Sequence, residues 1–378
     1  MKKFIASILA VVLLAGCSGG NGGNAGGSTG GGEEPSGGTY KVAYLINGNL
    51  GDKSFFDSAE SGLEQLQSQG RIDLTTIEMG ASDSDQPKWQ QTMDEVCDSE
   101  EYDFVIVGTW QMSDVVKETV ASYPDQKIIV FDSNDYAGEA GFENVCWITY
   151  KQNDLGYIIG TLAGLLTSDT SVEGINEEKV VGFVGGTDTP VINDFLYGFL
   201  EGAIAVEPDI KVDTRYVGDY VDSAKGKEYG ASMVADNKCD LVWGVAGNAG
   251  NGAAEAILEA GTGWFIGVDS DQELTFSSDL AAITLTSGLK NVGNSLVWLF
   301  DEMDAGKEYF GGDISLGIAE GGVGIVTDKN YDKTVSDEIK AKVQEAIDNI
   351  LSGSVSVPSA FEDGGNEAAM ALRDSVQP

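Results

Sequence analysis

The chain contains no histidine among its 378 residues. Nucleophilic systems of the Ser-His-Asp and Cys-His kinds need an imidazole base, and most zinc sites use histidine ligands. The absence therefore excludes these two large classes of catalytic and metal site. We expect neither a bound metal nor a cofactor.

Cysteine is also scarce, with Cys17, Cys97, Cys146 and Cys239 as its only occurrences. The last three form an odd set without the spacing of a metal site. A chain of this size can build a sufficient core without disulfides. We expect three buried thiols, and one disulfide pair is the alternative.

Basic residues are few, since 22 Lys and Arg stand against 61 Asp and Glu, a net charge of −39. Such a surface repels a phosphate backbone, which excludes nucleic acid as a partner. The acidic residues are spread along the chain rather than gathered in runs, as in a soluble, self-repelling surface. The same charge disfavours anionic ligands.

The one long apolar run lies at the N-terminus, where MKK precedes residues 4–14 and small residues lead to Cys17. The run is short for a membrane span and has the pattern of a secretory signal. Its ending, Leu-Ala-Gly-Cys, resembles a bacterial lipobox, in which the cysteine is acylated after cleavage. We expect a signal peptide over 1–16 and a Gly/Ser-rich tether over 17–39. An ordinary signal peptide with a chance cysteine is the alternative. The lipobox reading places the protein at the cell membrane, lipid-anchored on its extracytoplasmic face.

The roughly 340 residues after the tether suggest two domains. Short apolar runs of strand length occur at 42–46, 104–108, 128–131, 180–184, 241–245, 264–268 and 283–285. Helical segments follow most of them, at 54–67, 114–122, 154–166, 192–205, 224–235, 252–259 and 291–303. Continuous apolar strands between amphipathic helices predict parallel sheets covered on both faces. The fold class is α/β, doubly wound.

Ligands of such sheets bind beyond the carboxyl ends of the strands. The residues that the predicted strands deliver there are polar or aromatic, and the candidates include Asn47, Trp110, Asp132, Tyr220, Asn248, Asp269 and Lys290. The glycine-rich segment GNAGNG (247–252) lacks both GxGxxG order and a Walker lysine, so it predicts a tight start of a helix rather than a phosphate loop.

The segment GDKSFFDSAESG (51–62) carries two adjacent aromatic residues at the start of a predicted helix. Ser54 is a favourable N-cap, and Asp57 would complete a box-like pair. Phe55 continues an apolar stripe with Ala59, Leu63 and Leu66, whereas Phe56 lies about 100° away from that stripe. We expect an aromatic ring in the cleft here, with a ring that covers a loop as the alternative, and the sequence leaves open which of the two rings turns inward.

Several segments fall in the order seen in the basic membrane protein (Bmp) family, namely GDKSFFDSAESGLEQL, VGFVGGTDTPVINDFLYGFLEGA, YVGDYVDSAKGKEYGASM, AGNAGNGAAEAI, IGVDSDQ and TSGLKNVG. The chain resembles the purine-nucleoside receptor type of ABC-transporter substrate-binding lipoprotein from about residue 41 to residue 326. The resemblance implies a type I periplasmic-binding-protein fold, in which two α/β lobes enclose a ligand cleft. It implies lobe 1 at 40–149 plus 288–318, lobe 2 with hinge crossings at 150–287 plus 319–358, and a C-terminal tail at 359–378.

The resemblance also implies roles for residues. Phe55 or Phe56 would stack on one face of a nucleobase, and Phe195 or Tyr220 would cover the other. Two carboxylates and a lysine would hold the sugar, and amides and an indole would line the cleft: Asp132, Asp269, Lys290, Asn47, Trp110, Asn193 and Asn248. Aromatic faces and charge-assisted bonds to vicinal hydroxyls suit a neutral nucleoside.

One departure concerns base choice, because the family usually reads Ser-Phe-Asn where this chain reads Ser54-Phe55-Phe56. A ring in place of an amide makes a different base, or a sugar without a base, more plausible. The strand-end aspartates could also cap turns, Lys290 could be a surface residue, and Phe195 and Tyr220 could be core aromatics.

The expected function is capture of a nucleoside-like solute by a monomer that delivers it to an ABC permease. Alternatives are another small solute such as a sugar, a sensing partner of a membrane receptor, and a purely structural lipoprotein. A hydrolase using Asp132 and Asp269 as acid and base is disfavoured by the lack of histidine, nucleophile elbow and metal cluster. We therefore do not expect an enzyme.

Overall fold

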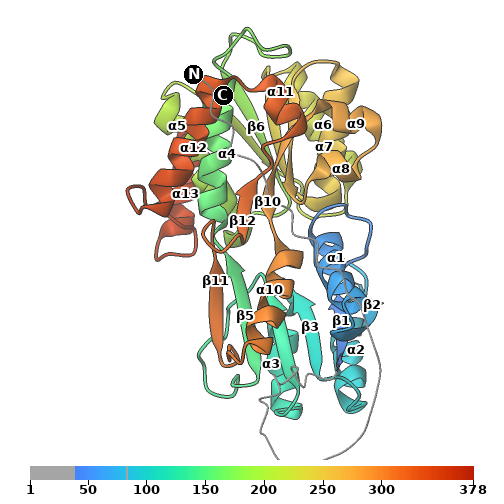
Figure 1. Ribbon diagram of the computed structural model, residues 1–378. Helices are drawn as coiled ribbons and strands as arrows, with labels where there is room; N and C mark the ends of the chain where they lie inside the picture. The colour runs from blue at the N-terminus through green and yellow to red at the C-terminus, as the bar shows by residue number, and fades with distance from the viewer. Residues whose placement is uncertain (1–38, 82–83) are drawn as a thin grey trace, which may run out of the picture. The chain divides into compact units, whose positions relative to one another are not determined.

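The computed structural model of the chain describes residues 39–81 and 84–378, which form two six-stranded sheets (Figure 1). The first sheet has the order β11 (Gly312–Leu316), β5 (Val145–Tyr150), β4 (Lys127–Phe131), β3 (Phe104–Gly108), β1 (Tyr40–Ile46), β2 (Ile72–Glu78). The second has the order β12 (Val323–Ile325), β10 (Thr284–Lys290), β9 (Trp264–Asp269), β8 (Leu241–Val245), β6 (Val180–Gly185), β7 (Lys211–Tyr216). Every pair is parallel except β10 with β12. The predicted doubly wound α/β class is confirmed.

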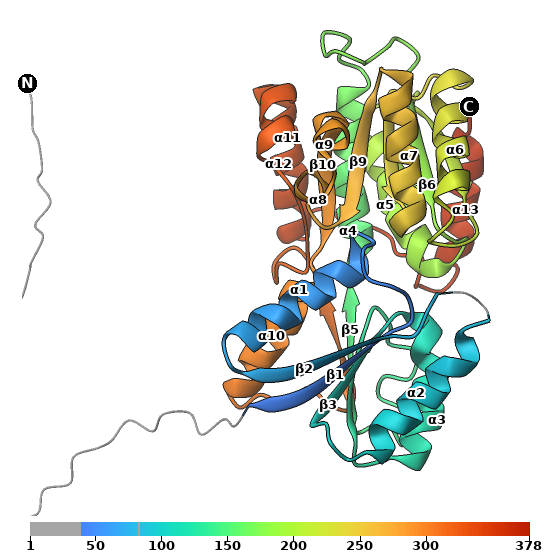
Figure 2. The ribbon, with the colours of Figure 1, turned by 90° about the vertical axis from the view of Figure 1, so that its right-hand side faces the viewer.

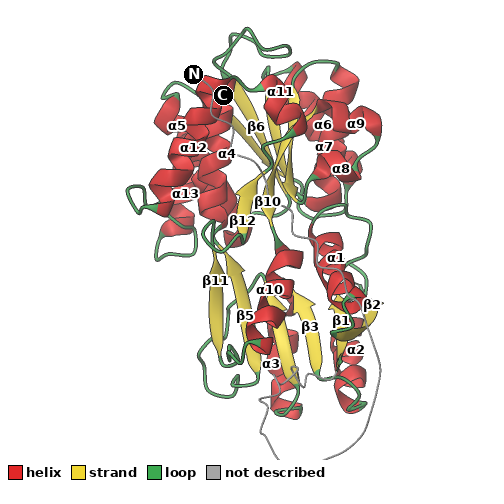
Figure 3. Cartoon of the chain, in the orientation of Figure 1, coloured by secondary structure: helices red, strands yellow, loops and turns green. Residues whose placement is uncertain are grey.

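Helices cover both faces of the first sheet, which we call lobe 1 (Figure 3). They are α1 (Phe55–Ser68) and α10 (Val292–Asp304) on one face, and α2 (Gln86–Asp98) and α3 (Ser113–Ser122) on the other. Alternate residues of β1 serve the two faces, because side chains of a strand point to opposite sides. Tyr44 and Ile46 pack in the core with α1, whereas Ala43 and Leu45 pack in the core with α2 and α3.

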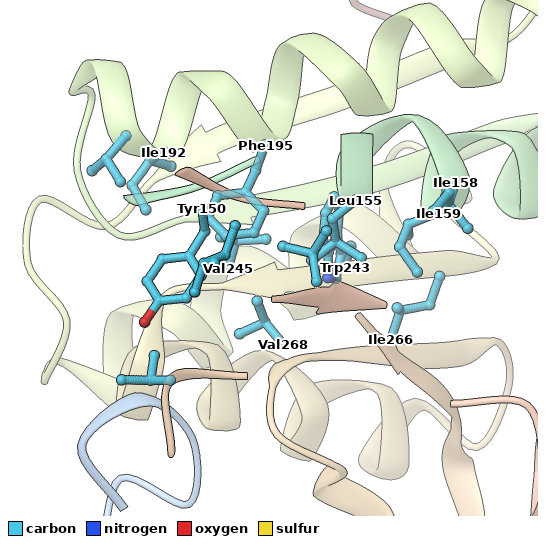
Figure 4. Close-up of a cluster of buried hydrophobic side chains, with 14 of the residues drawn as sticks. Tyr150, Leu155, Ile158, Ile159, Ile192, Phe195, Trp243, Val245, Ile266 and Val268 are labelled. Carbon is cyan, nitrogen blue, oxygen red and sulfur yellow. The ribbon is translucent and has the colours of Figure 1, made fainter. Parts of the chain in front are cut away.

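Lobe 2 is built on the second sheet in the same way (Figure 2). One face carries α4 (Gln152–Leu166) and α5 (Pro190–Val206), with α12 (Asp337–Leu351) on α4 and α13 (Gly365–Val376) on α5. The other face carries α6 (Ser223–Ala235), α7 (Gly247–Ala260), α8 (Gln272–Thr275) and α9 (Ser278–Ile283), and α11 (Lys329–Thr334) packs against β10. Part of the core between α4, α5 and the sheet is shown in Figure 4, where Phe195 and Trp243 lie close together.

Within the described residues the chain crosses between the lobes after β5, after β10, and between β11 and β12. Backbone bonds tie these crossings together: Lys151 N donates to Leu316 O at 3.0 Å, and Asn291 N donates to Gly322 O at 2.9 Å. The second crossing follows Lys290 rather than residue 287, because Gly288 and Leu289 still pair with β9.

The C-terminal residues 359–378 are not a separate tail, because they include α13 packed on α5. Their start is held by Asp194 of α5, whose Oδ1 accepts from Ser359 Oγ at 2.6 Å and from Ala360 N at 2.8 Å. The three cysteines at 97, 146 and 239 are buried free thiols, as predicted. GNAGNG forms the first turns of α7, as expected of a helix start.

Candidate functional site

A cavity of about 220 Å³ lies where strand ends of the two lobes face each other. Parallel strands point their carboxyl ends to one edge, so the loops that follow them meet there. The cavity is lined by almost all of the residues that the sequence proposed: Asn47, Phe55, Phe56, Trp110, Asp132, Phe195, Tyr220, Asn248, Asp269 and Lys290. Their individual roles toward a ligand stay predictions.

Asn193 is the exception, and its expected position in the cleft is wrong. It is fully buried on the other side of α5, where its Nδ2 donates at 2.8 Å to both Asp188 Oδ1 and Asn366 Oδ1. Tyr216 donates its hydroxyl to Asn193 Oδ1. The helix turns by about 100° per residue, so when Ile192 and Phe195 face the cavity, Asn193 faces α13 and β7.

The N-terminus of α1 is capped differently from the expectation. Ser54 occupies the N-cap position but makes no side-chain cap, because Asp52 accepts from Ser54 N, Phe56 N and Asp57 N at 2.9–3.2 Å. Asp57 instead accepts from Gly51 N at 2.7 Å and Lys53 N at 2.9 Å. The Ser54 hydroxyl is thereby free to reach the opposite lobe.

Both Phe55 and Phe56 line the cavity, whereas the sequence left open which of the two rings faces it. The Phe55 and Phe56 rings meet edge to face with centroids 5.2 Å apart, and Phe55 lies 5.4 Å from the ring of Phe131. Ala59, Leu63 and Leu66 form the buried stripe below them. Phe56 lies against Gly48, where an added Cβ would come within 2.4 Å of the ring.

Lys290 is a buried cation at the centre of the cavity wall. Its ammonium forms an ion pair with Asp132 of lobe 1, and it lies 5.2–5.4 Å from the centroids of the Phe55, Tyr150 and Phe195 rings. These contacts exclude the alternative of a surface lysine. Burial raises the pKa of Asp132, and the neighbouring Lys290 opposes that shift.

Asp269 is another buried carboxylate of the cavity, and it joins the two lobes. Ser54 Oγ of α1 donates to Asp269 Oδ2 at 2.7 Å. Burial raises the pKa of Asp269 to about 7, an effect that Lys290 and Ser54 oppose and that Asp52 and Asp132 reinforce. An acceptor with this pKa changes its protonation near neutral pH.

The aromatic side chains of lobe 2 are held in different ways. The Phe195 ring is buried and meets Trp243 edge to face at 5.8 Å. The Tyr220 ring lies over Gly186, where an added Cβ would come within 2.3 Å, and its hydroxyl lies 2.8 Å from Thr187 Oγ1. Phe195 belongs to the buried core, whereas Tyr220 is only partly buried, and both residues line the cavity.

Asn47 presents an acceptor without a partner. Its Nδ2 donates to Thr109 Oγ1 at 2.9 Å and to Gln111 Oε1 at 3.4 Å, which fixes the amide. Its Oδ1 is buried and has no donor within the described residues. A buried acceptor without a donor is costly, so this atom favours a ligand that donates a hydrogen bond.

The sequence selection missed other residues that line the cavity, namely Asp52, Thr109, Gln111, Thr187 and Asp219. The strand-end rule includes each of them, but they were not selected as ligand-binding residues. Nothing in their spacing separated them from ordinary turn residues.

Further contacts between the lobes surround the Ser54–Asp269 bond. Ser270 Oγ donates to Lys53 O at 2.8 Å, and Asn251 Nδ2 donates to Asp52 O at 3.2 Å. The start of α1 therefore rests directly on the strand ends and helix starts of lobe 2.

Across residues 39–81 and 84–378, no helix combines the length and apolar content that crossing a bilayer requires. The same residues contain no cluster of Cys, Asp or Glu arranged to hold a metal ion. Cys17 and the expected signal peptide lie outside the described residues.

Known proteins are similar to this one over nearly its whole length. Basic membrane protein A of Borreliella burgdorferi is 27% identical over 363 residues, which are 96% of each chain. A protein of Lactococcus lactis subsp. cremoris named ABC transporter nucleoside-binding protein BmpA is 28% identical, covering 95% of this chain and all of that one. Among solved structures, a solute-binding protein of an ABC transporter system from Aeropyrum pernix has a TM-score of 0.76 at 21% identity, over 89% of this chain and 99% of that one.

The last likeness shows the two-lobed fold alone. The family model described as "ABC transporter substrate-binding protein PnrA-like" matches residues 39–359, which include both sheets and every residue that lines the cavity. The chain therefore belongs to the Bmp family of ABC-transporter substrate-binding proteins.

Proposed function

We propose that the protein captures a purine nucleoside between its two lobes and delivers it to an ABC permease. One observation carries the proposal: aromatic rings from both lobes share a small cavity with Lys290, Asp132 and Asp269. Flat apolar faces suit a nucleobase, and the carboxylates suit the vicinal hydroxyls of ribose. The name of the Lactococcus lactis relative agrees with this ligand class.

The orientation follows from which groups are free. Phe55, Phe56 and Tyr220 offer ring surface, and Asn47 Oδ1 accepts a hydrogen bond from an N–H at the base edge. Asp269 and Asp132 accept from sugar hydroxyls, while Lys290 supplies the opposite charge. The carboxylates repel a phosphate, so nucleotides are rejected.

We infer that the two lobes close around the ligand and hold it. A ligand that touches both lobes stabilises the arrangement in which the start of α1 meets Asp269 and Ser270. The family consists of substrate-binding proteins, and we propose that this chain is likewise no enzyme. We also propose that acylated Cys17 holds it, as a monomer, at the extracytoplasmic face of the cell membrane.

The first experiment is a calorimetric titration of residues 39–378 with adenosine, guanosine, inosine and uridine. The protein is first unfolded and refolded to remove any co-purified ligand. We expect one-to-one binding of a purine nucleoside and loss of that binding in Asp269→Ala, because the ribose loses its acceptor.

The control is Asp98→Ala, which removes an exposed carboxylate at the end of α2 and leaves the affinity unchanged. Absence of heat with all four nucleosides would contradict the proposal. The fold would then stand, with Phe56 having adapted the cavity to another solute such as a sugar.

A further inference from the structure

A second and larger cavity, of about 840 Å³, lies beside the first. It is bounded in lobe 1 by β5, β11 and the loop after β4, and in lobe 2 by the starts of α4 and α5 and the segment between α12 and α13. In Figure 1 these elements lie together around β11 and the lower end of α13. Trp110, Asp132 and Val191 line both cavities.

The walls of this second cavity are strongly acidic. Lys151 is its only cation among the described lining residues, against the carboxylates of Asp132, Asp135, Asp154, Asp194, Asp313 and Glu362. Two of these are already satisfied: Asp132 pairs with Lys290, and Asp194 accepts bonds from Ser359, Ala360 and Asn153. The others leave negative charge facing the cavity, which attracts a cation.

An unpartnered acceptor in the first turn of α4 gives independent evidence for a ligand. Gln152 is 2% exposed, and its Oε1 is buried without a donor within the described residues. Asp154, two residues further on, is 9% exposed, and Lys151 opposes the rise that burial causes in its pKa. Buried polar atoms are nearly always paired, so the free Gln152 oxygen on this cavity wall points to an absent donor.

The exposed aromatic rings and the spacing of the carboxylates indicate what kind of donor fits this cavity. Trp110 of lobe 1 is 41% exposed and Phe361 of lobe 2 is 58% exposed, and both line this cavity. Aromatic faces attract organic cations. In residues 39–81 and 84–378 the carboxylates are too scattered to form a metal cluster. Dispersed charge with aromatic surface fits an extended amine rather than a compact ion.

We propose that the second cavity binds an aliphatic polyamine, with Asp154 and Gln152 accepting from one ammonium group and Asp313 and Asp135 facing another. This site adjoins the nucleoside site and shares Trp110, Asp132 and Val191 with it, but the residues proposed to bind the amine are different ones. The two lobes would then bind a polyamine in addition to the nucleoside.

The test is a calorimetric titration of residues 39–378 with spermidine at about 0.15 M salt, where long-range attraction is screened. We expect saturable one-to-one binding that Asp154→Asn weakens by about tenfold or more, because a charge-assisted bond is lost. Asp313→Asn, on the exposed face of an edge strand, should weaken it several-fold without affecting the fold. Glu64→Gln is the matched control, since Glu64 is exposed on α1 far from this cavity.

Three results would overturn the proposal. Spermidine binding that does not saturate, or that Glu64→Gln weakens as much as Asp154→Asn, would show general attraction to an acidic protein. Equal binding of Mg²⁺, lost in Asp154→Asn, would show that the site takes a metal ion. A titration of the same variants with inosine separates this proposal from the first, because Asp154→Asn should leave nucleoside affinity unchanged.

Discussion

Asp132 and Asp269 occupy matching places in the two lobes. Asp132 follows β4 and Asp269 ends β9, each strand being the third from one edge of its sheet, and each residue has a φ of 65°. Left-handed backbone costs a non-glycine residue about 1 kcal/mol or more, and aspartate is among the residues that tolerate it best. The strained turn directs a buried carboxylate from each lobe toward the shared Lys290. Local strain thus serves to place two acceptors around one cation.

Nucleoside affinity should depend on pH through Asp269. Its pKa of about 7 means that acidification protonates the acceptor that the ribose hydroxyls need. We expect affinity to fall as the pH is lowered from 8 to 5.5, as measured by calorimetry at both values. Asp269→Asn should bind weakly and show a flatter pH profile.

Burial also raises the pKa of Asp132, a shift that its ion pair with Lys290 opposes. Ser54, Lys290 and Asp52 are the other polar groups that act on Asp269. A wild-type affinity that does not change across this range would rule out the ionised carboxylate as the ligand acceptor.

Helix pairs on both lobes approach closely at glycines. An added Cβ on Gly160 of α4 would lie 2.0 Å from Phe199 O, and one on Gly202 of α5 would lie 2.1 Å from Tyr157 O. Gly62 of α1 and Gly293 of α10 meet in the same way in lobe 1. These contacts fix the helices whose first turns surround the two cavities.

Gly202→Ala should therefore destabilise the protein although alanine favours helices. The gain in helix propensity is about 1 kcal/mol, whereas separating two packed helices costs about 1–3 kcal/mol or more. We expect a lower midpoint of urea unfolding. Gly312→Ala is the control, because an added Cβ there meets nothing within 4 Å. Equal midpoints for the two variants would show that α4 and α5 can move apart freely.

Sequence reasoning found most of the central strands because burial on both faces makes them continuous apolar runs, but it missed β5, which lies between β4 and β11. The edge strands β2, β7 and β11 escaped it, since each has an open face with polar residues such as Thr75, Arg215 and Asp313. β10 was predicted too short because Thr286 and Ser287 are polar yet buried. Thr286 donates its hydroxyl to Val326 O at 2.6 Å, a partner that no local pattern reveals.

The same limit applies to the site. Strand ends located most of the cavity because topology alone brings them together. Whether Asn193 faces the cavity depends on the rotation of α5 about its own axis, and the sequence alone does not determine that rotation. The role of Ser54 depended on Asp269, a partner 215 positions away that competes with local capping. Long-range partners are the part of the site that a single sequence does not contain.

The molecule carries several buried carboxylates whose pKa is raised by burial. The pKa is about 6 for Asp194 and about 7 for Asp240 and Asp269. Asp240 lies just before β8 and accepts from Thr167 Oγ1 at 2.9 Å, and among the described residues no cation lowers its pKa. Together with the net charge of −39, these groups make the folded state bind protons more tightly than the unfolded chain.

Thermal stability without ligand should therefore be higher at pH 5.5 than at pH 8. The folded pKa values exceed the unfolded value of about 4, so this stabilisation is present at low pH and is lost as the pH rises through 6 to 7. Calorimetric melting of residues 39–378 across this range should show a Tm that falls by a few degrees. Asp240→Asn should reduce the fall, because it removes one of the titrating groups. A Tm that rises over this interval would contradict the assignment.

Strand β1 starts at Tyr40 and reaches the cavity only at Asn47, about 20 Å further along the chain. The polypeptide thus enters lobe 1 at the edge of the sheet that faces away from the solutes. An attachment upstream of Thr39 would therefore connect to lobe 1 at the end opposite to the cavity, and lobe 2 would be joined to it only through the three crossings.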